Sequence, residues 1–311
     1  MNKTLSLLVI SQLLLAACGK VDRRNTISVS GAWALYPLTV RWAEEYRKIH
    51  PEIRIDISAG GAGKGMADVL GELVEIGMVS REINPEELKR GALPVAVAKD
   101  AVVAVISEKN PSLNEVLSRG LTVEAAVGIW IKGDFKTWGD VLNTGSDYPI
   151  HVYTRSDACG AAEIWALLLG KKQEDLTGVG VYGDPGLAQA VKRDSLGIGY
   201  NNIGYVYDFN TKLQVPGLKI VPIDTDCDGR ISDEEAFYDS MNEMIDAIAS
   251  GKYPSPPSRE LYYVIKGKPS DSKALKDFLL WILSEGQKYV RETGYVPLPE
   301  STTASELKKL K

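Results

Sequence analysis

The sequence has few of the residues that most often carry nucleophilic or metal chemistry. Its 311 residues include only three cysteines and two histidines. So few cysteines cannot form a disulfide framework, and we expect Cys159 and Cys227 to stay apart. His50 and His151 have no companion in sequence that would complete a triad or a metal site. An excess of basic residues is also missing, because the formal net charge is −5, and this argues against a nucleic-acid-binding surface.

Long apolar runs are absent beyond the N-terminus. Residues 1–17 combine Lys3 with an apolar stretch that is too short to span a bilayer comfortably, and small residues precede Cys18. This pattern resembles a bacterial lipoprotein signal, in which Cys18 becomes the lipid-modified first residue; an ordinary secretory signal is the alternative. Residues 18–25 then form a polar tether. We therefore expect a protein of the periplasm or cell surface that is anchored to the membrane by lipid.

Strand-like and helix-like segments alternate along the mature chain, which predicts an α/β fold. About 290 residues are enough for two lobes, and the 44% hydrophobic content supplies a core. Two β-like runs, 102–107 and 261–266, bracket the middle of the chain. If each crosses between lobes, residues 26–104 and 262–311 form a discontinuous lobe I and residues 105–261 form lobe II.

The same pattern predicts strands over 93–97 and 101–107 and long helices over 234–249 and 271–293. Residues 297–311 are expected to form a low-complexity tail.

Three glycine-bearing turns, 30–34, 60–65 and 155–161, each lie between a strand-like and a helix-like run. A helix start leaves its first N–H groups unpaired, and the helix dipole favours negative charge there. Because the carboxyl ends of strands gather at one edge of a sheet, the turns are predicted to meet around one small anion, with Arg155 as a clamp.

The order and spacing of these blocks resemble the phosphate-binding lipoproteins that serve ABC importers. The blocks that carry the resemblance are 30–38, 58–65, 76–83, 135–138, 155–160 and 197–200. The resemblance implies a two-lobed type II periplasmic binding protein fold with a ligand cleft between the lobes. It also implies phosphate or a related oxyanion as ligand and an ABC permease in the membrane as partner, and we expect a monomer.

The chain departs from the family pattern where hydroxyl donors are usual, at Ala32 to Ala34, Cys159 and Ala161. Backbone donors and Arg155 remain, Asp157 is placed to orient the guanidinium, and Lys64 and Arg81 are candidates to replace the lost hydroxyls with charge. The candidate ligand-binding residues are Ala32, Trp33, Ala34, Ala62, Gly63, Lys64, Arg81, Arg155, Asp157, Cys159, Gly160 and Ala161.

Three of these candidates have a purely structural alternative. The alternatives are a surface or inter-helix salt bridge for Arg155, a solvated first helical turn for Lys64, and the role of an inert small residue for Cys159. A thiol phosphatase would need an arginine at the position of Trp165, so catalysis is not expected. The expected function is capture of phosphate, or a similar tetrahedral oxyanion, for an ABC importer. The alternative is a lipoprotein that binds another oxyanion and acts as a sensor without transport.

An acidic segment, residues 224–235, fits the twelve-residue calcium loop. Gly229 permits the bend, and the predicted oxygen ligands come from Asp224, Asp226, Asp228, the carbonyl of Arg230, and Glu235. The alternative is a solvated acidic turn. We expect a structural Ca²⁺ ion in lobe II.

Overall fold

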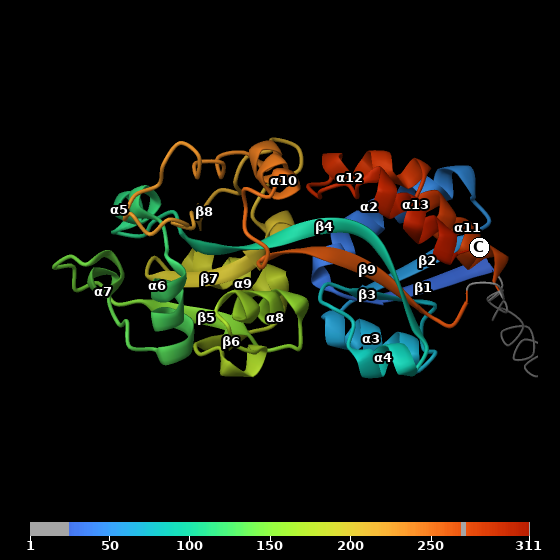
Figure 1. The fold of residues 1–311 in the computed structure, drawn as a ribbon, viewed down its shortest axis with the longest axis horizontal. Helices are drawn as coiled ribbons and strands as arrows, with labels where there is room; N and C mark the ends of the chain where they lie inside the picture. Colours follow the sequence, from blue (N-terminus) through green and yellow to red (C-terminus); the bar gives the residue numbers. More distant parts are fainter. Residues whose placement is uncertain (1–24, 269–271, 311) are drawn as a thin grey trace, which may run out of the picture.

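The computed structural model describes residues 25–268 and 272–310. The predicted signal peptide, Cys18 and nearly all of the tether lie outside the described residues. The molecule is elongated, with two lobes joined by the long strands β4 (Ala92–Ser107) and β9 (Ser258–Lys266) (Figure 1). No helix within the described part of the chain is long and apolar enough to cross a membrane.

Lobe I is built on the strand order β2-β1-β3-β9-β4. Strand β1 (Thr26–Gly31) is parallel to β2 (Arg54–Ala59) and β3 (Ile76–Val79), and β9 is antiparallel to β3 and β4. The register pairs Gly31 with both Ala59 and Met78, so three strands end at one edge of the sheet. The helices of this lobe are α2 (Tyr36–Ile49), α3 (Ala62–Leu70), α4 (Pro85–Lys89), α11 (Lys273–Ile282), α12 (Lys288–Glu292) and α13 (Glu300–Lys309).

Lobe II uses the second half of β4, which pairs with β7 (Gly197–Asn202) and β8 (Leu218–Val221). Strand β5 (His151–Arg155) is parallel to β7 and to β6 (Val179–Val181). The helices of lobe II are α5 (Leu113–Arg119), α6 (Val123–Val127), α7 (Trp138–Leu142), α8 (Gly160–Leu168), α9 (Gly183–Arg193) and α10 (Met241–Ser250).

Strand β4 contributes side chains to both hydrophobic clusters of lobe II. Successive side chains of a strand point to opposite faces of its sheet. Val102, Ala104 and Ile106 therefore enter one buried cluster, with the helices α6 to α8. Ala101, Val103 and Val105 enter a second cluster on the other face, with α9 and α10. Both faces are covered, which explains why this strand is apolar without alternation.

The alternation of strands and helices confirms the predicted α/β class, but several boundaries differ. The strands expected over 93–97 and 101–107 form the single strand β4, because pairing with β9 continues past a bulge at Ala96/Ala98. The helix expected over 234–249 begins only at Met241, where Ser240 is a capping residue. The expected helix 271–293 is broken into α11, a 3-10 turn (Glu285–Gln287) and α12.

The low-complexity segment at the C-terminus forms a helix, which the sequence analysis did not predict. Its helix α13 packs on β4, and the Glu306 carboxylate accepts a hydrogen bond from the Ala96 N–H at 3.2 Å. Sequence alone could not place this contact, because the two residues lie 210 positions apart.

Candidate functional site at the lobe interface

The first two glycine turns are packed backbone against backbone at the end of the lobe I sheet. The carbonyl of Gly31 accepts hydrogen bonds from the N–H groups of Gly60 and Gly61, at 2.9 and 3.1 Å. Gly31 has φ +131°, and a Cβ atom there would lie 2.3 Å from the Met78 carbonyl oxygen. Only glycine fits such a position, so the sequence pattern is explained by close approach as well as by conformation.

The third turn reaches these two from lobe II. The Gly63 N–H donates to the Ala158 carbonyl at 3.3 Å. A Cβ atom on Gly160 would lie 2.1 Å from the Ser80 carbonyl oxygen. A Cβ atom on Gly183 would lie 3.2 Å from the indole of Trp33. The structure thus brings all three turns together, with the lobes in direct contact.

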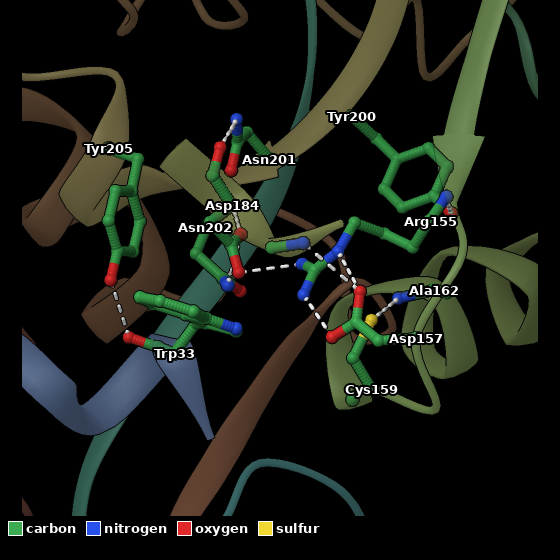
Figure 2. Close-up of polar contacts among 12 residues, drawn as sticks. Trp33, Arg155, Asp157, Cys159, Ala162, Asp184, Tyr200, Asn201, Asn202 and Tyr205 are labelled. Atoms are coloured by element: carbon green, nitrogen blue, oxygen red, sulfur yellow. Dashed lines mark hydrogen bonds and ion pairs between the residues drawn. The ribbon is translucent and has the colours of Figure 1, made fainter. Parts of the chain in front are cut away.

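Arg155 lies at the centre of this interface, at the end of β5, with its side chain only 1% exposed. Its Nε and Nη2 donate to the two carboxylate oxygens of Asp157, at 2.8 and 2.7 Å, and its Nη1 donates to Asp184 Oδ2 at 2.6 Å (Figure 2). Burial alone would lower the pKa of Arg155, but the charges of Asp184 and Asp157 raise it above its usual value. The guanidinium is therefore permanently charged.

Asp184 continues this network toward the strands that join the lobes. Its Oδ1 accepts from the backbone N–H and side-chain amide of Asn202, at 3.3 and 2.6 Å. Arg259, on β9, donates to Asn202 Oδ1, to the Gly160 carbonyl, and to Asp100 Oδ1 at 2.9 Å. Burial raises the pKa of Asp100 to about 6, although Arg259 opposes this shift.

Sequence reasoning missed these four partners of the site. Asp184 follows β6 at the start of α9, and Asn202 ends β7. A polar residue at or just past the end of a strand was the available signal for both. Asp100 and Arg259 gave no such signal, because Asp100 lies in the middle of β4 and Arg259 near the start of β9.

Lys64 and Arg81 lie near the turns, but their charges are paired with carboxylates of the protein. The Lys64 ammonium bonds Asp68, one helical turn further on, and its side chain is 45% exposed. Arg81 donates to both oxygens of Glu87, at 2.9 and 2.6 Å, and lies 3.4 Å from Glu163. No hydrogen bond or ion pair among the described residues joins either side chain to Arg155. Lys64 lies in the first turn of α3 and is partly exposed, as the alternative of a solvated first-turn lysine requires, but it also pairs with Asp68.

Cys159 is the N-cap of α8, and its Sγ accepts from the Ala162 N–H at 3.4 Å. Burial raises the pKa of its thiol to about 12, so the thiol is protonated and unreactive at neutral pH. The described residues supply no hydrogen-bond partner for the N–H groups of Gly160 and Ala161 in the first turn of this helix. In the first glycine turn, by contrast, the Ala32 N–H donates to the Met78 carbonyl at 2.9 Å.

The acidic loop lies elsewhere in lobe II, between β8 and α10. Carboxylate oxygens of Asp224, Asp226 and Glu235 lie within 4.8 Å of one another. Asp228, by contrast, pairs with the Arg230 side chain at 2.9 Å.

Substitution of Asp184 tests how much the buried ion pair with Arg155 contributes to the stability of the folded protein. Replacing Asp184 with Ala leaves the guanidinium of Arg155 with one counter-ion, so we expect the free energy of unfolding to fall by about 3 kcal/mol. Urea denaturation measures this change. The matched control is Asp277→Ala, which removes an exposed i,i+4 partner of Lys273 and should cost less than about 0.5 kcal/mol. Equal losses in the two variants would contradict the expectation.

The chain is similar in sequence to known periplasmic binding proteins. A family model described as a PBP superfamily domain matches residues 19–286. The phosphate-binding protein PstS of Pseudomonas aeruginosa is 29% identical, over 92% of this chain and 87% of that protein. The phosphate-binding protein PstS of Methanocaldococcus jannaschii is 25% identical, over 90% and 84%.

A crystal structure of a putative phosphate ABC transporter substrate-binding protein from Clostridium perfringens, with bound phosphate, superposes with a TM-score of 0.72. It is 24% identical, and the match covers 88% of this chain and all of that one (100%). Together with the family match, this likeness confirms the mixed α/β, two-lobed periplasmic binding protein fold that the sequence predicted.

Proposed function

The chain belongs to the PBP superfamily, and on that premise we propose that it captures phosphate, or a similar tetrahedral oxyanion, outside the cytoplasm and delivers it to an ABC importer. The names of its relatives in Pseudomonas and Methanocaldococcus support phosphate as the ligand. The observation that carries the proposal is a set of N–H donors without partners, gathered around a buried arginine where the two lobes meet.

Arg155 itself supplies two of these donors. A guanidinium has five N–H groups, and Asp157 and Asp184 accept three of them. The remaining two, one on Nη1 and one on Nη2, are left for the charge-assisted hydrogen bonds that arginine forms with an oxyanion. Gly160 and Ala161 add backbone N–H groups at the positive end of the α8 dipole. The local donors attract an anion, although the whole protein is acidic.

Trp33 supplies a further donor in place of the missing hydroxyls. Its Nε1 is buried and has no hydrogen-bond partner among the described residues. Figure 2 shows this nitrogen on the side of the indole that faces Arg155. Trp138 and Trp165 also have unpaired Nε1 atoms, but these rings are fully buried in the core of lobe II. Trp33 differs because it belongs to lobe I and packs against lobe II.

Capture requires the two lobes to close around the ligand. Trp33 and Ser80 come from lobe I, and Tyr205, Gly160 and Gly183 come from lobe II. The Tyr205 hydroxyl donates to the Trp33 carbonyl at 2.9 Å, so closure is held by contacts beside the ligand donors. The cost of removing an anion from water is offset when charge-assisted hydrogen bonds form in a site without water.

Three further parts of the proposal concern the membrane anchor, the absence of catalysis and the partner. Cys18 would hold the lipid that keeps the monomeric protein at the membrane of the periplasm or cell surface. Binding without catalysis is supported by the protonated, buried thiol of Cys159. A sensor that binds the oxyanion without a permease would use the same cleft, and co-purification with a permease separates the two functions.

Isothermal titration with phosphate, arsenate, sulfate and molybdate tests the ligand, and Trp33→Phe tests the indole donor. Phenylalanine keeps a ring against Gly183 but removes the N–H, so we expect at least about a tenfold weaker affinity for phosphate. Trp281→Phe, on helix α11 of lobe I, is the matched control and should bind phosphate as the wild type does. If Trp33→Phe binds phosphate as tightly as the wild type, the indole N–H is not a ligand donor. If the wild-type protein shows no heat of binding with any of the four oxyanions, the proposed function is rejected.

Gly160→Ala tests closure. The added methyl group would lie 2.1 Å from the Ser80 carbonyl oxygen, so the lobes could not reach their present contact. We expect at least about tenfold weaker phosphate binding, because the donors of the two lobes no longer converge. Gly145→Ala is the control, since a Cβ atom there has no neighbour within 4 Å. Equal phosphate affinity in both variants would show that closure does not need this approach.

A further inference from the structure

We propose that the loop 224–235 of lobe II binds one Ca²⁺ ion, and that this ion clamps the loop against the segment that follows α5. The site is separate from the cleft. No hydrogen bond or ion pair within the described part of the chain joins the loop to Arg155 or to its network.

The loop backbone is already shaped to bring its carboxylates together. The Gly229 N–H donates to Asp224 Oδ2 at 3.0 Å, and Gly229 has φ +81°, which favours glycine. Further along, the Asp228 N–H donates to Asp226 Oδ1 at 3.2 Å, and the Arg230 N–H donates to Asp228 Oδ1 at 3.0 Å. Asp224 and Asp226 therefore each keep one oxygen bound to the loop and can direct the other elsewhere, whereas both oxygens of Asp228 accept from Arg230.

An unpaired buried atom points independently to a cation. Asp224 is only 2% exposed, yet its Oδ1 is buried and has no hydrogen-bond partner among the residues that the structure describes. A buried carboxylate oxygen without a donor costs free energy that a bound cation would recover. Oxygens of Asp226 and Glu235 lie within 4.8 Å of the Asp224 carboxylate, so one ion can reach all three.

Glu235 shows what must change when the ion binds. Its Oε1 accepts from the N–H and hydroxyl of Thr225, at 2.8 and 2.5 Å. Its Oε2 accepts from the N–H and hydroxyl of Ser232, at 3.1 and 3.0 Å. Rotation of the two hydroxyls would free a lone pair on each oxygen, and the carboxylate could then bind the ion through both oxygens.

The loop is attached to the rest of lobe II at two points. The Ile231 N–H donates to the Ser118 carbonyl at 2.8 Å, and the Asp224 N–H donates to the Leu121 carbonyl at 3.3 Å. Ser118 lies in the last turn of α5, and Leu121 directly follows Gly120, the C-cap of that helix. An ion held by Asp224 and Glu235 would therefore fix this connection as well as the loop. Its effect is expected on the stability of lobe II and not on anion affinity.

Oxygen ligands from carboxylates and a carbonyl favour a hard cation. Flexible coordination by six to eight oxygens is typical of Ca²⁺, whereas Mg²⁺ demands a smaller octahedral site and retains its water. We therefore expect Ca²⁺ to bind at least about tenfold more tightly than Mg²⁺. Cys227 is exposed, and a thiol is not a ligand that such a cation prefers.

The test is titration of chelator-treated protein with CaCl₂ and with MgCl₂, followed by thermal unfolding in 1 mM CaCl₂ or in EDTA. We expect one Ca²⁺ per chain and a Tm higher by at least about 3 °C with Ca²⁺, because the ion binds only the folded loop. Asp226→Asn should weaken Ca²⁺ binding at least about tenfold. Its side chain is exposed, so the variant should fold normally.

Asp233→Asn is the matched control, because this exposed aspartate lies in the same loop at a position that supplies no ligand. It should keep the wild-type affinity for Ca²⁺. The proposal is overturned if wild-type protein shows neither Ca²⁺ binding nor a shift in Tm, or if the two variants bind Ca²⁺ equally. Phosphate titration in EDTA reports on the cleft alone, so failure of one proposal is distinguishable from failure of the other.

Discussion

The buried charge of Arg155 is the constraint around which the lobe interface is organised. A guanidinium at 1% exposure cannot be left without counter-ions, and Asp157 and Asp184 supply them from two different elements. Asp184 is in turn held by Asn202, which accepts from Arg259 on a strand that joins the lobes. Arg155 is thereby connected to the strands β4 and β9, which join the lobes. This arrangement orients Arg155 before a ligand arrives, and orientation in advance lowers the cost of binding.

The parts of this architecture that the sequence predicted are those with local causes. Alternating strands and helices, and glycines at the ends of strands, are properties of short segments. Gly31 illustrates this, because its conformation and its contact with Met78 both exclude a side chain. The pairing of Arg155 with Asp157 could also be predicted, because the two residues lie two positions apart and form their ion pair within one turn. The acidic loop was visible for the same reason.

The parts that the sequence did not predict depend on residues that lie far apart in the chain. Asp184 is 29 positions from Arg155, and Arg259 is 99 positions from Gly160, so no local spacing indicates either contact. Arg81 shows a related difficulty. The family resemblance made it a candidate to replace lost hydroxyl donors, and the structure pairs its guanidinium with the Glu87 carboxylate. Whether a charged side chain serves a ligand or a neighbour is decided by packing, and a single sequence does not contain that information.

The cleft and the acidic loop are of opposite electrostatic design. At the lobe interface, Trp33 Nε1 is a buried donor that has no partner among the described residues, whereas in the loop the unpaired buried atom is an acceptor, Asp224 Oδ1. Each unpaired buried group costs about 1–3 kcal/mol, so each lowers the stability of the empty protein. An anion can recover the cost of an unpaired donor, and a cation can recover the cost of an unpaired acceptor, but only while the ligand is bound. An anion would do so in the cleft by drawing the lobes together, and a cation would do so in the loop by fixing a turn within one lobe. The two proposed sites would therefore fill independently, even though both lie in or against lobe II.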